Sequence, residues 1–317
     1  MEMEKNKVLL EKVMNVKKEI SKAVLGKDEI IEKILTVVIS GGHILLEDIP
    51  GVGKTTLALA FSKATSLEYQ RLQFTPDVLP TDVTGFTVYD KKTDSFIYKP
   101  GAALCNLFLA DEINRTSSKT QSALLEIMEE GNITVDGVTH EIPQPFTVIA
   151  TQNPVGASGT QLLPDSQTDR FAVRISMGYP DFDAECQMLL NRNTSNPLDN
   201  VQCVVTKEQL IEMQKAVKAV FVHKDMAGYI VSLVNATRNN KLILRGASPR
   251  ATISLTQMAK AVAFANDRNY VTPKDVHFVF VNTLHHRIIL SSEATLQNTN
   301  AERVLANILQ KVKAPKI

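Results

Sequence analysis

The chain has 317 residues, about twice the length of a usual domain of roughly 100–200 residues, so two domains are expected. Hydrophobic residues make up 44% of the chain and charged residues 22%, a composition that excludes a largely disordered chain, a collagen-like fibre and a coiled-coil rod. The 35 Lys and Arg residues almost balance the 34 Asp and Glu residues, leaving a net charge of +1. A strongly basic nucleic-acid binder is therefore not indicated.

The sequence also predicts where the protein works. No apolar run approaches the roughly 18–20 residues of a membrane span, and the charged N-terminal stretch lacks the apolar core of a signal peptide. Three cysteines, Cys105, Cys186 and Cys203, show no metal-binding spacing, and an odd number cannot all pair internally. We expect reduced cysteines in a cytoplasmic protein.

The first part of the chain predicts helices, a strand, a loop and another helix. Apolar residues at helical spacing fill the first 40 residues, which end at Gly41-Gly42. The apolar run His43–Glu47 predicts a buried strand before a glycine-rich loop, and Leu57–Ala64 predicts the helix that follows the loop.

Three later apolar runs predict further strands: Asn106–Ala110, Phe146–Ala150 and Phe171–Ser176. Helical or loop sequence separates them, which is typical of a mostly parallel α/β sheet. Two hairpins are predicted between them. Residues 133–142 alternate around Asp136-Gly137, a strong turn signal, and residues 84–98 alternate around a weaker one.

The pattern changes after Pro180. Residues 184–192 look helical, residues 193–200 read as a linker, and from Thr206 onward the sequence predicts only helices. Thr206 and Thr272 are expected N-caps. The expected helices cover residues 206–218, 224–238, 248–267, 272–289 and 299–312. The chain is thus expected to form an α/β domain to about residue 180 and then a small helical domain.

The loop after the first strand predicts a phosphate site. Its right half matches G-x-x-x-x-G-K-[ST], in which backbone N–H groups and a helix N-terminus surround phosphate. Lys54 would reach the β- and γ-phosphates, and Thr55 would bind Mg²⁺. Asp48 stands where the strict pattern has its first glycine, and a carboxylate there would repel phosphate unless it points away. The residues expected around the nucleotide are Pro50, Gly51, Val52, Gly53, Lys54, Thr55 and Thr56.

Two further strands end in polar side chains that a nucleotide site needs. Asp111 can hold Mg²⁺ and Glu112 can activate the attacking water, because both follow an apolar strand. Asn153 follows the strand that begins at Phe146, and its amide could bind the γ-phosphate or the water. Arg170 and Arg250 are uninformative by themselves, since isolated arginines are usually solvated or in surface ion pairs.

Taken together, these motifs resemble the MoxR family of AAA+ ATPases. The resemblance runs from about residue 20 to the C-terminus, and the most specific stretches are DEINR followed by KTQSALLE, then TQNP and DRF; LLEDIPGVGKTTLA, RLQFTPDVLPTDVTGF and GASPRA also match. It implies a P-loop AAA+ parallel-sheet core with a C-terminal helical lid. The implied division is a core with a helix-2 insert over residues 1–180, a linker over 181–205 and a lid over 206–317.

The resemblance also assigns roles to residues. Lys54 and Thr55 match Walker A, and Asp111 and Glu112 match Walker B. Asn153 matches sensor 1. Arg170 matches the arginine finger, which acts on ATP held by a neighbouring subunit, and Arg250 matches sensor 2, which reads the γ-phosphate of its own subunit.

The implied activity is Mg²⁺-dependent ATP hydrolysis by a homo-oligomeric ring, expected to be a hexamer, that remodels or assembles partner proteins. Metal-cofactor insertion and a von Willebrand factor A domain partner are typical of the family. Three alternatives remain open: the ATPase subunit of a magnesium chelatase, a nucleic-acid-stimulated motor, and a slowly hydrolysing nucleotide-gated scaffold. Neutral charge and the absence of an aromatic-rich basic stretch weigh against the nucleic-acid motor.

Overall fold

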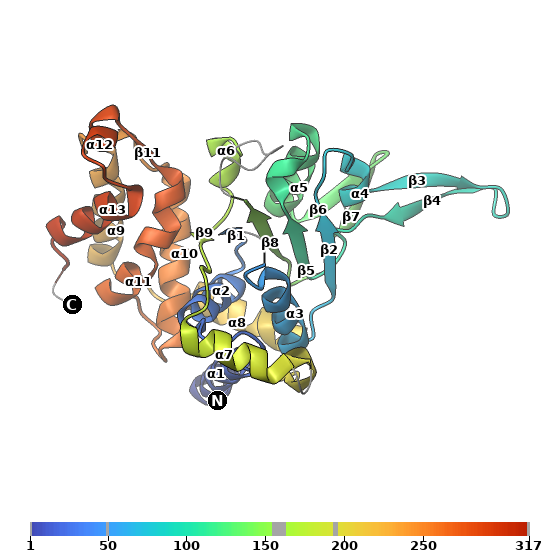
Figure 1. Cartoon of the computed structure of the whole chain (residues 1–317), viewed down its shortest axis with the longest axis horizontal. Helices are drawn as coiled ribbons and strands as arrows, with labels where there is room; N and C mark the ends of the chain where they lie inside the picture. The colour runs from blue at the N-terminus through green and yellow to red at the C-terminus, as the bar shows by residue number, and fades with distance from the viewer. Residues whose placement is uncertain (1, 49–50, 154–162, 193–195, 316–317) are drawn as a thin grey trace.

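A parallel sheet of five strands lies at the centre of the computed structural model, which describes residues 2–48, 51–153, 163–192 and 196–315 (Figure 1). The strand order is β2-β5-β8-β1-β9, and every neighbouring pair is parallel. The predicted parallel α/β sheet is therefore confirmed. The strands are β1 (Ile44–Glu47), β2 (Tyr69–Gln73), β5 (Leu107–Asp111), β8 (Thr147–Gln152) and β9 (Val173–Ile175).

Strand β2 was not predicted, because it lies at the edge of the sheet. It pairs only with β5, and all of its residues are half-buried or exposed. Its sequence YQRLQ has a single aliphatic residue, Leu72, whereas the buried strands of a parallel sheet form continuous apolar runs.

Successive residues of the central strands face two separate apolar cores. Ile44 and Leu46 pack in the core that contains helices α1 (Glu2–Ala23), α2 (Asp28–Ser40) and α3 (Lys54–Thr65). Leu45, between them, packs in the second core with helix α5 (Ser118–Glu130). This alternation follows from the two-residue period of a strand. Both faces of the sheet are thereby covered, as a parallel sheet requires.

Two hairpins leave the sheet domain, as predicted. The first, β3 (Gly85–Asp90) with β4 (Ser95–Pro100), follows the short helix α4 (Pro80–Thr84) and projects far from the rest of the molecule (Figure 1). The second pairs β6 (Asn132–Val135) with β7 (Val138–Glu141) around the predicted turn. Only glycine fits at position 85, where the first hairpin begins. The backbone there has φ of +87°, and a Cβ would lie 2.3 Å from the Lys99 carbonyl oxygen.

The second half of the chain is mostly helical, and its outermost helices lie at the opposite end of the molecule from the β3–β4 hairpin (Figure 1). Thr206 caps α8 in a capping box with Gln209, and the carboxylate of Asp275 accepts from the Thr272 backbone N–H at 2.7 Å before α11. Both N-caps are as predicted. The helices are α6 (Asp165–Thr168), α7 (Phe182–Arg192), α8 (Lys207–Ala219), α9 (Lys224–Arg238), α10 (Pro249–Ala265), α11 (Pro273–Leu284), α12 (Ser292–Leu296) and α13 (Ala301–Lys311), with 3-10 turns η1 (Ile113–Arg115), η2 (Pro197–Asn200) and η3 (His285–Arg287).

The expectation that everything after Thr206 is helical is wrong in one place. Ile243–Arg245 (β10) and Ile289–Leu290 (β11) form a small antiparallel pair, and the helix expected to reach residue 289 ends at Leu284. The two strands have only three and two residues, too few for a two-residue alternation to appear in the sequence. Their pairing depends on contacts between distant segments.

The N-terminal helices and the later helices share one apolar core. Both α8 and α10 pack against α2, and side chains from all three belong to the same buried cluster. The packing therefore shows no break at residues 180 and 205, and the division of the chain at these residues stays a prediction. None of the helices in the described residues is long and apolar enough to cross a membrane.

Candidate nucleotide site

The loop between β1 and α3 has the backbone of a phosphate-binding turn. Gly51 and Gly53 have φ of +90° and +93°, and nothing lies within 4 Å of the place where a Cβ would stand on either. Glycine is thus needed for the left-handed backbone and not for space. Gly53 is the N-cap of α3, so the unpaired N–H groups of the first helical turn face the loop. Pro50, expected to contact the nucleotide, lies outside the described residues.

Asp48, which departs from the strict motif, points away from this loop. Its buried carboxylate accepts hydrogen bonds from the Ser176 hydroxyl (2.8 Å) and from the backbone N–H groups of Met177 and Gly178. These donors come from the chain just after β9. The side chain therefore connects the start of the loop to the segment that follows the neighbouring strand. Because the carboxylate points away from the loop, it is not placed to repel phosphate there.

Lys54 lies buried at the start of α3, close to the acidic residues. Its ammonium donates to the Asp48 carbonyl oxygen at 2.9 Å. Burial lowers the pKa of Lys54, while the charges of Asp111, Asp48 and Glu112 act in the opposite direction. These electrostatic interactions bring together the Walker A and Walker B residues that the sequence predicted. Thr55 and Thr56 follow in the first turn of α3.

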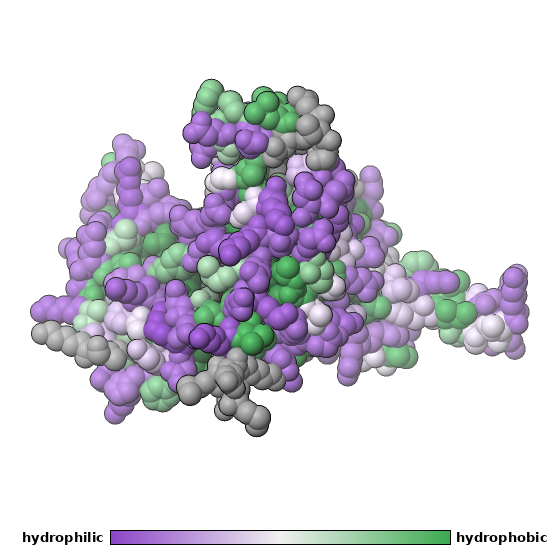
Figure 2. Space-filling view, turned by 90° about the horizontal axis from the view of Figure 1, so that it is seen from below, coloured by the Kyte–Doolittle hydropathy of each residue, from purple (hydrophilic) through white to green (hydrophobic). Residues whose placement is uncertain are grey.

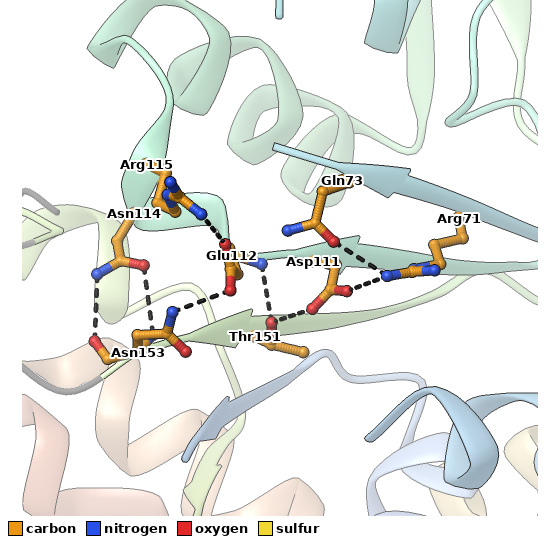
Figure 3. Close-up of polar contacts among 8 residues, drawn as sticks. All are labelled: Arg71, Gln73, Asp111, Glu112, Asn114, Arg115, Thr151 and Asn153. Atoms are coloured by element: carbon orange, nitrogen blue, oxygen red, sulfur yellow. Dashed lines mark hydrogen bonds and ion pairs between the residues drawn. The ribbon is translucent and has the colours of Figure 1, made fainter. Parts of the chain in front are cut away.

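Asp111 ends β5 with both carboxylate oxygens engaged (Figure 3). Oδ1 accepts from the Thr151 hydroxyl at 2.7 Å, and Oδ2 accepts from the Arg71 guanidinium at 2.7 Å. Arg71 also donates to the Gln73 side chain. Neither Arg71 nor Thr151 was singled out from the sequence. The carboxylate at the end of this strand offers oxygen ligands of the kind that Mg²⁺ takes, and Arg71 occupies one of them in this structure.

Glu112 follows in a left-handed backbone conformation, with φ of +57°, which is uncommon for a residue other than glycine. Its backbone N–H donates to the Thr151 hydroxyl, its Oε1 accepts from the Asn153 amide at 3.0 Å and its Oε2 accepts from Arg115 at 2.7 Å (Figure 3). Partial burial raises the pKa of Glu112, but the hydrogen bonds from Arg115 and Asn153 outweigh it, so the net pKa is lowered.

Asn153 is held from both sides. Its backbone N–H and carbonyl bond to the side chain of Asn114, and its amide nitrogen donates to Glu112 (Figure 3). Its Oδ1 is buried and has no hydrogen-bond partner among the described residues. A buried amide oxygen without a partner next to a carboxylate is a place where a water molecule can donate. The predicted pairing of strand ends is therefore present, and Asn114 is an unpredicted member.

A hollow of about 340 Å³ opens beside the loop. Gly51, Gly53 and Thr56 line one part of it, and Val24 and Tyr179 lie among the side chains of its other walls. Its lining has more apolar than polar character, which suits the flat face of a nucleotide base. The segment after α1 that contributes to this hollow carried no motif in the sequence.

Arg170 and Arg250 lie elsewhere. Both pair with Glu129 at the end of α5: Nη2 of Arg170 is 3.2 Å from Oε2, and Arg250 contacts Oε1. The position of this cluster relative to the sheet follows from the contacts of His43, a neighbour of both Met128 and Ala172. His43, just before β1, donates to the Met128 carbonyl at 3.1 Å and accepts from the Ala172 N–H at its own carbonyl.

Arg170 and Glu129 are thus at the amino edge of the sheet, where the parallel strands begin. The loop, Glu112 and Asn153 are at the carboxyl edge, where the strands end. The two edges are separated by the length of β1, about 13 Å for its four residues. This geometry does not support the expectation that Arg250 reads the γ-phosphate of its own subunit.

Comparisons with known proteins agree with this description. The family model "ATPase family associated with various cellular activities (AAA)" matches residues 43–173, and the model for the AAA lid domain matches residues 235–308. The crystal structure of a Cytophaga hutchinsonii protein assigned as an ATPase aligns with a TM-score of 0.92 and 38% identity, over 99% of this chain and 98% of that one. The fold and the site define an AAA+ ATPase with a helical lid.

Relatives in sequence narrow the class. The chain is 35% identical to "Chaperone MoxR1" of Mycobacterium tuberculosis over 94% of this chain and 81% of that protein. It is 44% identical to the uncharacterised protein YeaC of Bacillus subtilis, over 93% of this chain and 92% of that one. The chain belongs to the MoxR family of AAA+ ATPases, as the sequence resemblance indicated.

Proposed function

We propose that this ATPase hydrolyses Mg²⁺-bound ATP at the carboxyl edge of the sheet and uses the cycle to remodel or assemble a partner protein. The observation that carries the chemical part is the contact between Glu112 and Asn153, which leaves the Asn153 Oδ1 as a second acceptor beside the carboxylate. Two neighbouring acceptors can orient both hydrogens of an attacking water.

The loop residues have distinct roles in this proposal. The N–H groups at the start of α3 bind phosphate oxygens, and Lys54 neutralises the β- and γ-phosphates. The lowered pKa of Glu112 keeps its carboxylate ionised at neutral pH, so it can accept a proton from the water. The hollow beside Gly51 and Tyr179 holds the base.

Thr55 and Asp111 are the residues proposed to hold Mg²⁺. No group of three or more His, Cys, Asp or Glu side chains in the described residues could hold a metal by itself, and Mg²⁺ is commonly bound by one or two protein groups together with substrate phosphates. When bound, Mg²⁺ neutralises charge that develops on the phosphate oxygens. The Arg71 contact with Asp111 must open for the carboxylate to be available.

We propose that Arg170 and Arg250 act on ATP held by a neighbouring subunit. Both arginines lie at the amino edge, a strand length from the loop of their own subunit. A closed ring, with a hexamer as the expected size, brings the amino edge of one copy to the carboxyl edge of the next. AAA+ ATPases commonly form rings of this kind, and the hydrolysed phosphate gains cations that its own subunit does not supply.

The β3–β4 hairpin is the proposed contact for a client protein. Phe86, Tyr89 and Phe96 on it are 48%, 47% and 75% exposed. Tyr89 and Phe96 also meet edge to face across the two strands, at 5.5 Å. In Figure 2 hydrophobic side chains lie along the projecting hairpin behind a hydrophilic tip. Exposed aromatic side chains on a protruding element are typical of a protein-binding surface.

The family suggests what kind of partner this protein has but does not identify it. The relative named as a chaperone supports a protein client, and a von Willebrand factor A domain partner, metal-cofactor insertion and a cytoplasmic location are carried over as proposals. The described residues hold three free cysteines, as a reducing compartment would require.

The substitution Glu112→Gln tests the chemical proposal. It preserves the size and shape of the side chain but cannot accept a proton, so ATP binding should persist while hydrolysis falls by a factor on the order of 10²–10⁴. Calorimetry and single-turnover hydrolysis measure the two effects separately. Glu141→Gln, on the exposed strand β7, is the matched control and should hydrolyse ATP at the wild-type rate. Wild-type turnover in Glu112→Gln would remove this residue from the mechanism.

A further inference from the structure

Glu129 binds two arginines that come from different parts of the chain. It stands in the last turn of α5; Arg170 comes from the turn before β9, and Arg250 from the first turn of α10. Each carboxylate oxygen holds one guanidinium: Oε2 that of Arg170 and Oε1 that of Arg250. A single carboxylate thus joins the α/β part of the chain to the helical part.

The charges of the three groups explain why a shared carboxylate is useful here. Two guanidinium groups on one site repel each other, and a carboxylate between them cancels one charge and fixes their separation. Arg170 also donates to the Leu125 carbonyl. The side chain of Arg250 is 49% exposed, and Glu129 is its ion-pair partner within the part of the chain that the structure describes. Removing Glu129 therefore leaves Arg250 without a described group that orients it.

The backbone around both arginines is fixed independently of Glu129. The buried Arg287 pairs with Asp169 at 2.8 Å and donates to the Phe171 carbonyl, and the Ser248 hydroxyl donates to Asp169. These contacts hold the turn before β9 against the start of α10. Loss of Glu129 should then release the side chain of Arg250, and leave that of Arg170 with its bond to the Leu125 carbonyl, without unfolding the segments that bear them.

We propose that Glu129 is a positioning residue that holds Arg170 and Arg250 as a pair for the ATP of the neighbouring subunit. The inference rests on the proposed trans role of the two arginines. Glu129 touches no nucleotide of its own site, since it lies at the amino edge. It acts by setting the distance between the two guanidinium groups. The two arginines and the carboxylate together carry a net charge of +1, which would face the γ-phosphate of the next subunit.

The same surface supplies a matched control. A hollow of about 380 Å³ beside α5 is lined by Arg170 together with Glu126, Glu129 and Glu130. Glu126 is exposed, and its side chain forms no hydrogen bond or ion pair with any other residue that the structure describes. Glu126→Gln and Glu129→Gln therefore remove the same charge from the same helix, and only the second removes the carboxylate that the two arginines share.

The test compares the two variants in the assembled full-length protein at saturating ATP. Glu129→Gln should lower kcat by about 10- to 100-fold, the size expected when catalytic groups are misplaced by about an ångström. Its dissociation constant for ATP should stay at the wild-type value, because binding depends on the intact loop of the same subunit. Glu126→Gln should match the wild type in both. An unchanged or increased kcat in Glu129→Gln would overturn the proposal.

A mixing experiment separates this role from a general structural one. Glu129→Gln mixed with Lys54→Ala should regain activity, because some interfaces then combine an intact loop with an intact arginine pair. In an Arg250→Ala background, Glu129→Gln should cost a smaller factor than in the wild type, since one of its two partners is already gone. Additive losses and no recovery would contradict the proposal.

The single-arginine variants distinguish failure of this inference from failure of the proposed function. If Arg170→Ala and Arg250→Ala both keep the wild-type kcat, the trans role of the arginines is wrong, and the Glu129 proposal fails with it. If both lose activity alone and regain it when mixed with Lys54→Ala, while Glu129→Gln keeps the wild-type kcat, the trans role stands and only the Glu129 proposal is overturned.

Discussion

Asp48 illustrates how one residue shapes the phosphate loop without contacting phosphate. The sequence marks it as a departure from the strict motif, and the structure gives its carboxylate three donors from residues 176–178. Its backbone carbonyl oxygen meanwhile accepts from Lys54. A carboxylate satisfied in this way is committed to the adjacent strand. The loop therefore begins at a fixed point beside β9.

Lys54→Ala tests the loop assignment at the same scale. The substitution removes the positive charge that is expected to meet the β- and γ-phosphates, so ATP affinity should become too weak to measure by calorimetry. Lys91→Ala, in the exposed tip of the β3–β4 hairpin, changes the charge equally and should bind ATP like the wild type. Unchanged ATP binding by Lys54→Ala would remove the phosphate-loop assignment.

The sequence predicted the acids and amide of the site but not what holds them. Glu112 and Asn153 stood out because each follows an apolar strand. Thr151, which binds Asp111 and the backbone of Glu112, looked like an ordinary strand residue. Arg71 lay in a strand that was not recognised at all. Contacts between neighbouring strands leave no trace in the spacing of residues along one strand.

At the scale of elements, burial decided which strands could be predicted. Strands β5 and β8 are fully buried and were expected within one or two residues of their ends. The edge strand β2 and the short pair of β10 with β11 were missed, since their segments lack a long apolar run or alternation. Such segments become strands because the fold places a pairing partner beside them.

His43 connects three elements just before β1 and makes the fold sensitive to acid. Its Nδ1 accepts from the Val148 N–H at 3.0 Å, and its Nε2 donates to the Met128 carbonyl. Burial lowers the pKa of His43 to about 4 from the ordinary 6.5. Between these two pH values the unfolded chain binds a proton that the folded chain does not.

The free energy of unfolding should therefore fall as the pH drops from about 6.5 toward 4, by at most about 3 kcal/mol for this residue. Chemical denaturation at a series of pH values measures the dependence. His43→Gln should be less stable than the wild type at neutral pH and should lose less stability on acidification. Equal pH dependence in His43→Gln and the wild type would contradict this account.

At the scale of the whole molecule, the parallel sheet separates two sets of charged groups. Lys54, Asp111 and Glu112 gather at the carboxyl edge, while Arg170 and Arg250 meet at Glu129 on the amino edge. Lone arginines gave no sign of this arrangement in the sequence, because the residues that meet come from α5, the turn before β9 and α10. A family resemblance assigned their roles, and the topology supports the proposal that both serve a neighbouring subunit.

The most direct test of the shared site mixes two inactive variants, Lys54→Ala and Arg170→Ala. An arginine finger contributes about 10³–10⁵ in rate, so neither variant alone should hydrolyse ATP measurably. In mixed rings some interfaces join an intact loop to an intact arginine, and activity should partly return. Arg250→Ala mixed with Lys54→Ala should recover in the same way, since Arg250 lies beside Arg170. Mixed rings that assemble and remain inactive would contradict a site shared between subunits.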